Sequence, residues 1–232
     1  MTHGESRRAD RAIIYRSEID FVSRCILDCP NIETGGELFG FWTAGGIPVV
    51  LFAIGPGPNA NHQITFFNQD IGYLEHVGHR LFSKYGLLHI GEWHSHHQLG
   101  LAQPSGHDAS TMATSIASNH LGRFLMALGN RTQELSVLNA FEFVEGFGTD
   151  WRHVPWEIKE VASPFRAAVE GDEQLAAMLC NPRIKTPRHG KLFTVPVTDG
   201  GALGERALPA LGDADYIDRS GFVVDGASPC VG

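Results

Sequence analysis

The feature that most constrains the fold of this chain is the stretch from residue 87 to residue 108. It begins with an apolar run typical of a buried strand and passes through His94-Ser95-His96. It ends in Pro104-Ser105-Gly106-His107-Asp108, which is typical of a helix start. Five of the twelve histidines lie between positions 89 and 107. This density of imidazoles indicates a metal site.

Strand geometry predicts how two of these histidines are arranged. Successive side chains of a strand point to opposite faces, so His94 and His96 are expected to project in the same direction. The third ligand should come from the next element, and Asp108 in the first turn of the predicted helix is the candidate because a helix N-terminus favours a carboxylate. Two histidines and one carboxylate leave a fourth position for water, which is typical of a catalytic zinc site.

A catalytic zinc site also needs a carboxylate that accepts a proton without binding the metal. Zinc lowers the pKa of bound water from ~15.7 to about 7. Glu37 follows Gly35-Gly36 at the head of a predicted strand and is the candidate for the base. Taken alone, Glu37 would be an ordinary residue at a strand end and Ser105 an ordinary helix cap. Their order relative to the histidines is what makes them candidates.

The hydrophobic patterning predicts an α/β domain with a mixed or antiparallel sheet and helices packed on it. Turn residues divide the chain, including Ala44-Gly45-Gly46 and the loop 55–61. The predicted strands are 12–15, 37–42, 47–54, 64–67, 87–96, 124–128, 135–144 and 151–158. Four helices are predicted. The first spans 17–28 with Ser17 as its cap, and the second is capped by Asn68, ends at Gly86 and has Ile71 and Phe82 on its apolar face. The third spans 105–119, and the fourth spans 163–179 with a break at Gly171-Asp172.

The chain length favours one domain plus a tail. The predicted domain spans residues 10–180. From Asn181 onward, prolines and glycines interrupt the pattern, so residues 181–232 are expected to be an irregular C-terminal extension.

The composition of the chain argues against several classes of function. Hydrophobic residues make up 43% and charged residues 19%, as in globular proteins. The net charge of −8 argues against nucleic acid or an anionic membrane as a partner. No apolar run is long enough to cross a bilayer, and the polar start of the chain does not read as a signal peptide. The four cysteines form no CxxC pair, so a reduced, cytoplasmic protein is expected.

The residues in this order resemble the JAMM motif of the JAB/MPN metalloproteases. That motif is a glutamate, a distant His-x-His and a Ser-x-x-Asp shortly after it. Glu37, residues 94–96 and residues 105–108 match it, and Glu33-Thr34-Gly35-Gly36 resembles the usual approach to the family's glutamate. The resemblance covers roughly residues 10–160, and four elements occur in the family's order.

The resemblance implies a fold, a site and an activity. The fold would be JAB/MPN-like, a mixed sheet flanked by helices and related to that of cytidine deaminases. His94, His96 and Asp108 would bind Zn²⁺, Glu37 would be the general base, and Ser105 would hydrogen-bond the oxyanion. The activity would be hydrolysis of the isopeptide or peptide bond after the C-terminal glycine of a ubiquitin-like protein. Such a deubiquitinase-like isopeptidase would act on ubiquitin-like conjugates.

The segment between the His-x-His and Ser105 further resembles JAB proteases of bacterial ubiquitin-like conjugation operons. In those operons, E1-like and E2-like proteins would be partners. The sequence departs from the family pattern twice. The spacing from His96 to Asp108 is one residue longer than usual, so His107 competes as third ligand; Asp108 is preferred because it keeps the Ser-x-x-Asp relation. His97 occupies a position that is often proline.

The sequence bears differently on three alternatives to the isopeptidase. A zinc deaminase would need His-x-Glu and Pro-Cys-x-x-Cys, and the sequence has neither. A non-catalytic MPN scaffold module would typically lack the ligands, which are all present here. A JAB peptidase that trims a sulfur-carrier protein is not separated from the isopeptidase, because both substrates end in Gly-Gly.

Overall fold

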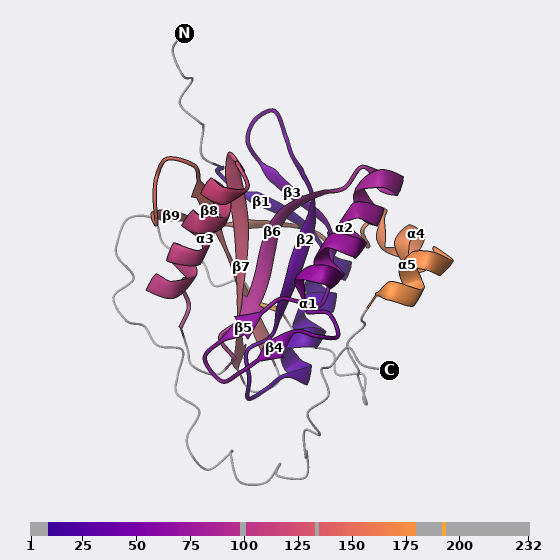
Figure 1. Ribbon diagram of the computed structural model, residues 1–232, viewed down its shortest axis with the longest axis horizontal. Coiled ribbons are helices and arrows are strands. Elements are labelled where there is room, and N and C mark those ends of the chain that lie inside the picture. Colours follow the sequence, from indigo (N-terminus) through magenta and orange to yellow (C-terminus); the bar gives the residue numbers. More distant parts are fainter. Residues whose placement is uncertain (1–8, 98–100, 133–134, 180–191, 194–232) are drawn as a thin grey trace.

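The computed structural model describes residues 9–97, 101–132, 135–179 and 192–193, and its main feature is a nine-stranded mixed sheet (Figure 1). The strand order is β10-β1-β3-β2-β6-β7-β8-β11, and β9 also pairs with β8. The sheet contains β1 (Ala12–Tyr15), β2 (Gly35–Trp42), β3 (Pro48–Ala53), β6 (Leu88–Ser95), β7 (Arg123–Thr132), β8 (Leu135–Val144), β9 (Trp151–Val154), β10 (Trp156–Lys159) and β11 (Leu192–Phe193).

A two-stranded hairpin and five helices complete the described part of the chain. The hairpin, residues 61–68, consists of β4 (Asn61–His62) and β5 (Phe67–Asn68). The helices are α1 (Arg16–Asp28), α2 (Ile71–Tyr85), α3 (Gly106–Ser118), α4 (Arg166–Glu170) and α5 (Glu173–Met178). The predicted α/β class, with a mixed sheet flanked by helices, is therefore confirmed.

The main sheet closes almost completely on itself. β10 pairs with β1 at one end of the strand order, and β9 pairs with β8 near the other end. Only Pro155 separates β9 from β10, and its carbonyl accepts a hydrogen bond of 2.9 Å from the Ala12 N–H. The Trp156 indole N–H donates to the Leu138 carbonyl at 3.1 Å, which ties the two ends together.

Helix α1 packs on one face of this sheet. Ile19, Val22 and Ile26 recur at helical spacing and form one buried cluster with Trp93 and Leu125 of the central strands. Each such side chain contributes about 1.5–3 kcal/mol on burial. The enclosed face is therefore the largest apolar core of the domain.

The opposite face of the sheet carries α2 and α3. Val77 and Leu81 of α2 pack in a cluster with Phe52 of β3, and Met112 and Ile116 of α3 pack on β7 and β8. Figure 1 shows these two helices on either side of β6. Strand β6, which carries the start of the histidine-rich stretch, thus runs along the middle of the sheet, between two helices.

Turn chemistry explains most helix ends. Gly86 adopts a left-handed φ of 68° and ends α2 as predicted. Ser105 caps α3, also as predicted. The break at residues 171–172 separates α4 from α5, and Asp172 caps α5.

Two predicted caps are wrong. Helix α1 begins at Arg16 with Tyr15 as its N-cap and no side-chain cap hydrogen bond. Ser17 lies inside α1, where its hydroxyl accepts from the Ser163 N–H at 2.8 Å. The cap of α2 is Asp70 rather than Asn68, because the Asp70 carboxylate accepts from the Tyr73 N–H at 3.1 Å.

Some predicted strands and apolar positions also differ. The strand predicted at 64–67 is replaced by the 61–68 hairpin, with Ile64 between β4 and β5. The strand predicted at 151–158 is divided at Pro155, which has no N–H to donate. Ile71 and Phe82 of α2 are 59% and 56% exposed rather than buried.

Among the described residues, no helix combines the length and apolar character needed to span a membrane. The predicted extension at 181–232 lies outside the described residues except for β11, which pairs with β8 in parallel.

Candidate metal centre

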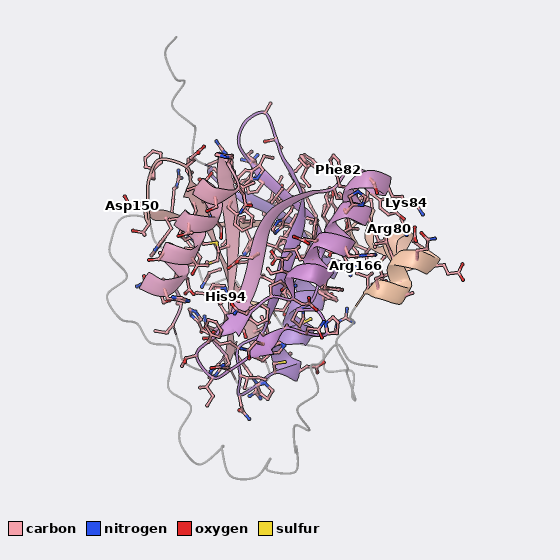
Figure 2. All side chains as sticks on the ribbon, in the orientation of Figure 1. Arg80, Phe82, Lys84, His94, Asp150 and Arg166 are labelled. Carbon is pink, nitrogen blue, oxygen red and sulfur yellow. The ribbon has the colours of Figure 1, made fainter. Side chains whose placement is uncertain are left out.

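The end of β6 and the start of α3 bring three predicted ligands together. His94 lies in β6, and His96 follows directly after the strand, with its N–H bonded to the Gly129 carbonyl at 2.8 Å. The alternation of side chains places both imidazoles on the face that α3 covers. Asp108 approaches them from the first turn of α3. Figure 2 shows His94 near the end of β6, beside α3.

The distances between the ligand atoms fit a small divalent ion. His94 Nε2 lies 3.3 Å from His96 Nε2, and the Asp108 oxygens lie 3.6 Å from His94 Nε2 and 3.3 Å from His96 Nε2. Zinc bonds of ~2.0–2.1 Å in a tetrahedron set neighbouring ligand atoms about 3.3 Å apart. The three side chains have ligand atoms that all lie within 4.8 Å of one another and could hold a metal ion.

The outer nitrogens of both imidazoles face acceptors. His94 Nδ1 lies 3.4 Å from Glu92 Oε1, and His96 Nδ1 lies 3.1 Å from the Leu101 carbonyl oxygen. An acceptor opposite Nδ1 favours the tautomer in which Nδ1 carries the proton and Nε2 a lone pair. Two lone pairs at 3.3 Å repel unless a proton or a metal ion lies between them. The arrangement therefore suits a cation at the centre of the cluster.

The electrostatics of the cluster favour positive charge. Burial lowers the pKa of His94, but the carboxylates of Asp108 and Glu92 outweigh it and raise that pKa to about 10. Burial raises the pKa of Asp108, but its contacts with His94 and His96 hold it well below its usual range. A proton and a metal ion compete for such a site, and both are attracted by its negative potential.

Ser105 and Asp108 form a reciprocal capping box at the start of α3. The Ser105 hydroxyl oxygen accepts from the Asp108 N–H at 3.2 Å, and Asp108 Oδ2 accepts from the Ser105 N–H at 2.7 Å. The ordinary helix-cap interpretation of Ser105 is confirmed. The hydroxyl accepts in this contact, so its own proton is available to a ligand oxygen.

The structure does not bring Glu37 to the ligand cluster. In the β2–β6 pairing, Gly35 lies opposite His94 and Glu37 lies opposite Glu92. Continued by two residues, this register sets Glu33 opposite His96. The backbone confirms the continuation, because the Ser95 N–H donates to the Thr34 carbonyl at 2.7 Å.

Glu33 interacts electrostatically with the ligands His96, His94 and Asp108. It is buried, and burial raises the pKa of its carboxyl while the imidazoles of His96 and His94 lower it in part. Its backbone is fixed by the 61–68 hairpin: its N–H donates to the Gln63 carbonyl, and its carbonyl accepts from His62. In the resemblance to the JAMM motif, Glu33 belongs only to the approach to the glutamate. Alternation makes Glu33 a second candidate beside Glu37, since 33 and 37 share a strand face, but it does not choose between them.

Glu37 pairs with His89 instead. Its Oε2 lies 2.7 Å from His89 Nε2, and the His89 ring contacts the rings of Phe39 and Phe124. Burial raises the pKa of Glu37, and His89 lowers it in part. The predicted role of Glu37 as the base at the metal is therefore not supported by its position.

The residues that departed from the family pattern lie beside the cluster. His97 adopts a left-handed φ of 35°, and its Nε2 donates to the Ile64 carbonyl at 2.6 Å, which fastens the 61–68 hairpin to the end of β6. The ring of His107 lies against that of Phe66, with 6.3 Å between centroids. Among the described residues, Asp108 and not His107 completes the ligand cluster.

Comparison with known proteins adds information on the fold alone. No family model matches the chain, and no curated protein matches it. Its fold is similar to that of the solution structure of protein DSY2949 from Desulfitobacterium hafniense. The TM-score is 0.50 and the sequence identity 16%, over 65% of this chain and 94% of that one.

Proposed function

We propose that this protein is a zinc-dependent peptidase of the JAB/MPN type that cleaves after the C-terminal glycine of a ubiquitin-like protein. The observation that carries the proposal is the convergence of His94, His96 and Asp108, with ligand atoms spaced as a tetrahedral ion requires. The order of motifs that resembles the JAMM motif supplies the reaction type. A scaffold module would not need this ligand set.

The chain's own residues would divide the work as follows. His94, His96 and Asp108 hold the ion, which supplies Lewis acidity and lowers the pKa of a water molecule to about 7. Glu33 takes the place predicted for Glu37: its buried carboxyl, with a raised pKa, accepts the proton of the attacking water and passes it to the leaving amine. The Ser105 hydroxyl donates a hydrogen bond to the oxyanion.

The 61–68 hairpin gives this site a second wall. Gly35 lies against the ring of Phe67, so a Cβ at residue 35 would come within 2.4 Å of that ring. This close approach, together with the His97 bond to Ile64, holds the hairpin next to Glu33.

The test compares two matched substitutions. Purified zinc-loaded protein is incubated with a ubiquitin-like protein bearing a C-terminal peptide extension and with one joined to a lysine side chain. Glu33→Gln should reduce cleavage by at least about 100-fold, in the range of general acid–base catalysis, with zinc retained. Glu37→Gln, the same change at a site that contacts His89, should leave most of the activity.

Each outcome of this test bears on the proposal. Cleavage that survives Glu33→Gln and disappears in Glu37→Gln would restore Glu37 as the base. A zinc-loaded protein that cleaves neither substrate contradicts the proposed activity. Cleavage of the peptide extension alone favours maturation of a precursor or trimming of a sulfur carrier. Cleavage of the lysine-linked substrate supports action on conjugates, with E1-like and E2-like proteins as functional partners.

A further inference from the structure

The two histidines of the candidate metal centre are oriented by different acceptors. His94 Nδ1 faces the carboxylate of Glu92 at 3.4 Å, whereas His96 Nδ1 faces the neutral Leu101 carbonyl at 3.1 Å. Glu92 lies on β6, two residues before His94 and on the same face of the sheet. Leu101 lies in the connection to α3. One ligand is therefore held by a charged group of the sheet and the other by the backbone of a loop.

Glu92 belongs to a row of acids and imidazoles that leads away from the metal centre. It lies directly opposite Glu37 in the β2–β6 pairing, and like charges in that position repel. His89 offsets this repulsion: it bonds to Glu37 at 2.7 Å and is attracted to Glu92 as well. A quarter of the Glu92 side chain is exposed. The attraction to His89 and this partial exposure allow a carboxylate at residue 92 although β6 is a central strand of the sheet.

We propose that Glu92 is a positioning residue of the metal centre. It accepts the Nδ1 proton of His94, holds the Nε2 lone pair toward His96 and Asp108, and so strengthens metal binding. The proposal rests on the proposed metal centre and adds to it the group that orients one ligand. A carboxylate opposite a ligating imidazole raises the basicity of the ligand, and the loss of such a partner typically weakens metal binding 10–100-fold.

The first test measures zinc affinity on the full chain by competition with a chromophoric chelator. Glu92→Leu removes the acceptor and should weaken zinc binding about 10–100-fold. Glu92→Gln keeps an acceptor oxygen but removes the charge, so its loss should be smaller. Glu75→Gln, the same change on the exposed side of α2, should bind zinc like the wild type. Thermal unfolding of the metal-free variants shows that each is folded.

The second test separates positioning from general support of the fold. In ¹⁵N-labelled protein, the Nδ1–H resonance of His94 should be present and shifted downfield by its acceptor, with and without zinc. Glu92→Leu should remove or shift this resonance and leave that of His96, which faces Leu101, in place. Because the spectrum is also read without metal, it reports on Glu92 independently of zinc binding.

The outcomes separate this proposal from the proposed function. Wild-type protein that binds no zinc contradicts the proposed function and with it the metal-centre role of Glu92, while the His94 resonance still shows whether Glu92 orients that ring. Zinc affinity in Glu92→Leu equal to that of the wild type overturns the proposal. A loss of affinity with an unchanged His94 resonance also overturns it, since the effect would then come from elsewhere in the fold.

Discussion

The interior of this protein contains two clusters of ionisable side chains that are completed in different ways. In the first, Glu18 of α1 is fully buried and forms a two-pronged ion pair with Arg166 of α4. The Glu18 carboxylate also accepts from the Ala53 N–H at 2.8 Å, and the guanidinium lies 4.0 Å above the ring of Phe52. Each charge of this cluster meets an opposite charge supplied by the chain.

The second cluster is the candidate metal centre. There, two imidazole nitrogens and a carboxylate converge at 3.3–3.6 Å, and their outer atoms are fixed by other groups. Figure 2 shows the labelled side chains of the two clusters, Arg166 and His94, in different parts of the domain. The comparison shows that burial and charge alone do not identify a functional site. What distinguishes the second cluster is that its acceptors point inward at a common centre.

Breaking the first cluster should have the largest effect on stability. Arg166→Met leaves the Glu18 carboxylate buried without its cation and should reduce the free energy of unfolding by about 3–5 kcal/mol, measured in urea. The double variant Glu18→Leu with Arg166→Met should recover much of this loss, because no buried charge remains. A cost below about 1 kcal/mol for the single variant would show that the pair is not needed for stability.

Breaking the second cluster should affect metal binding more than stability. Asp108→Ala should weaken zinc binding by more than about 100-fold, beyond the range for groups that only orient a ligand. Its effect on stability should be about 1 kcal/mol, from the lost capping box. His107→Ala is the control and should change the affinity less than about threefold. The reverse result would make His107 the third ligand.

Adding zinc should raise the thermal stability through the second cluster and not through the first. At a free zinc concentration 100 times the Kd, the folded state gains about 2.7 kcal/mol, which corresponds to a rise in Tm of about 5–10 °C for a chain of this size. The same rise is expected in Arg166→Met, because the first cluster does not contact the metal ligands. Asp108→Ala, with its affinity weakened more than about 100-fold, should show a rise of less than about 2 °C at that concentration. These shifts are measured by calorimetry with and without a chelator.

Asp28 is a half-buried acidic residue that belongs to neither cluster, and removing its charge should be mildly stabilising. Its Oδ2 is buried without a hydrogen-bond partner among the described residues, and burial raises its pKa to about 6, offset in part by Arg24. The folded state therefore binds more protons than the unfolded chain between pH 3.8 and about 6, and stability falls as pH rises through that window.

Asp28→Asn removes this penalty. The expected gain is about 1 kcal/mol at pH 7, less than the full shift implies because the carboxyl is partly exposed, and it should vanish below pH 4. Urea unfolding at several pH values measures it. Asp150→Asn, the same change at an exposed position, is the matched control. A gain that is equal at pH 4 and pH 7 would contradict the assignment to ionisation.

Much of the fold and of the ligand set could be predicted because the signals are local. The alternation of His94 and His96, the capping pair of Ser105 and Asp108, and the stop at Gly86 each depend on residues a few positions apart. Ser17 and Asn68 failed as caps because tertiary contacts and a neighbouring residue, Asp70, decided those helix ends.

The choice between Glu33 and Glu37 could not be made from the sequence. Both residues flank the same glycine pair and share a strand face, so local patterns do not separate them. What separates them is the register between β2 and β6, which are some fifty residues apart in the chain and are aligned by the packing of the sheet. The position of Arg166 beside Glu18 is long-range in the same way, since no periodicity links α1 to α4.

The almost closed sheet has a consequence for the order in which the strands pair while the chain is synthesised. β1 can pair with β3 as soon as residue 53 has been synthesised, but its other edge pairs with β10 at residues 156–159. During synthesis, that edge of β1 stays open while the candidate metal ligands and their strands have already been synthesised. Closing a loop of this length is costly in entropy and slow. The last pairing that encloses α1 is therefore expected to form late, after the ligand cluster has assembled.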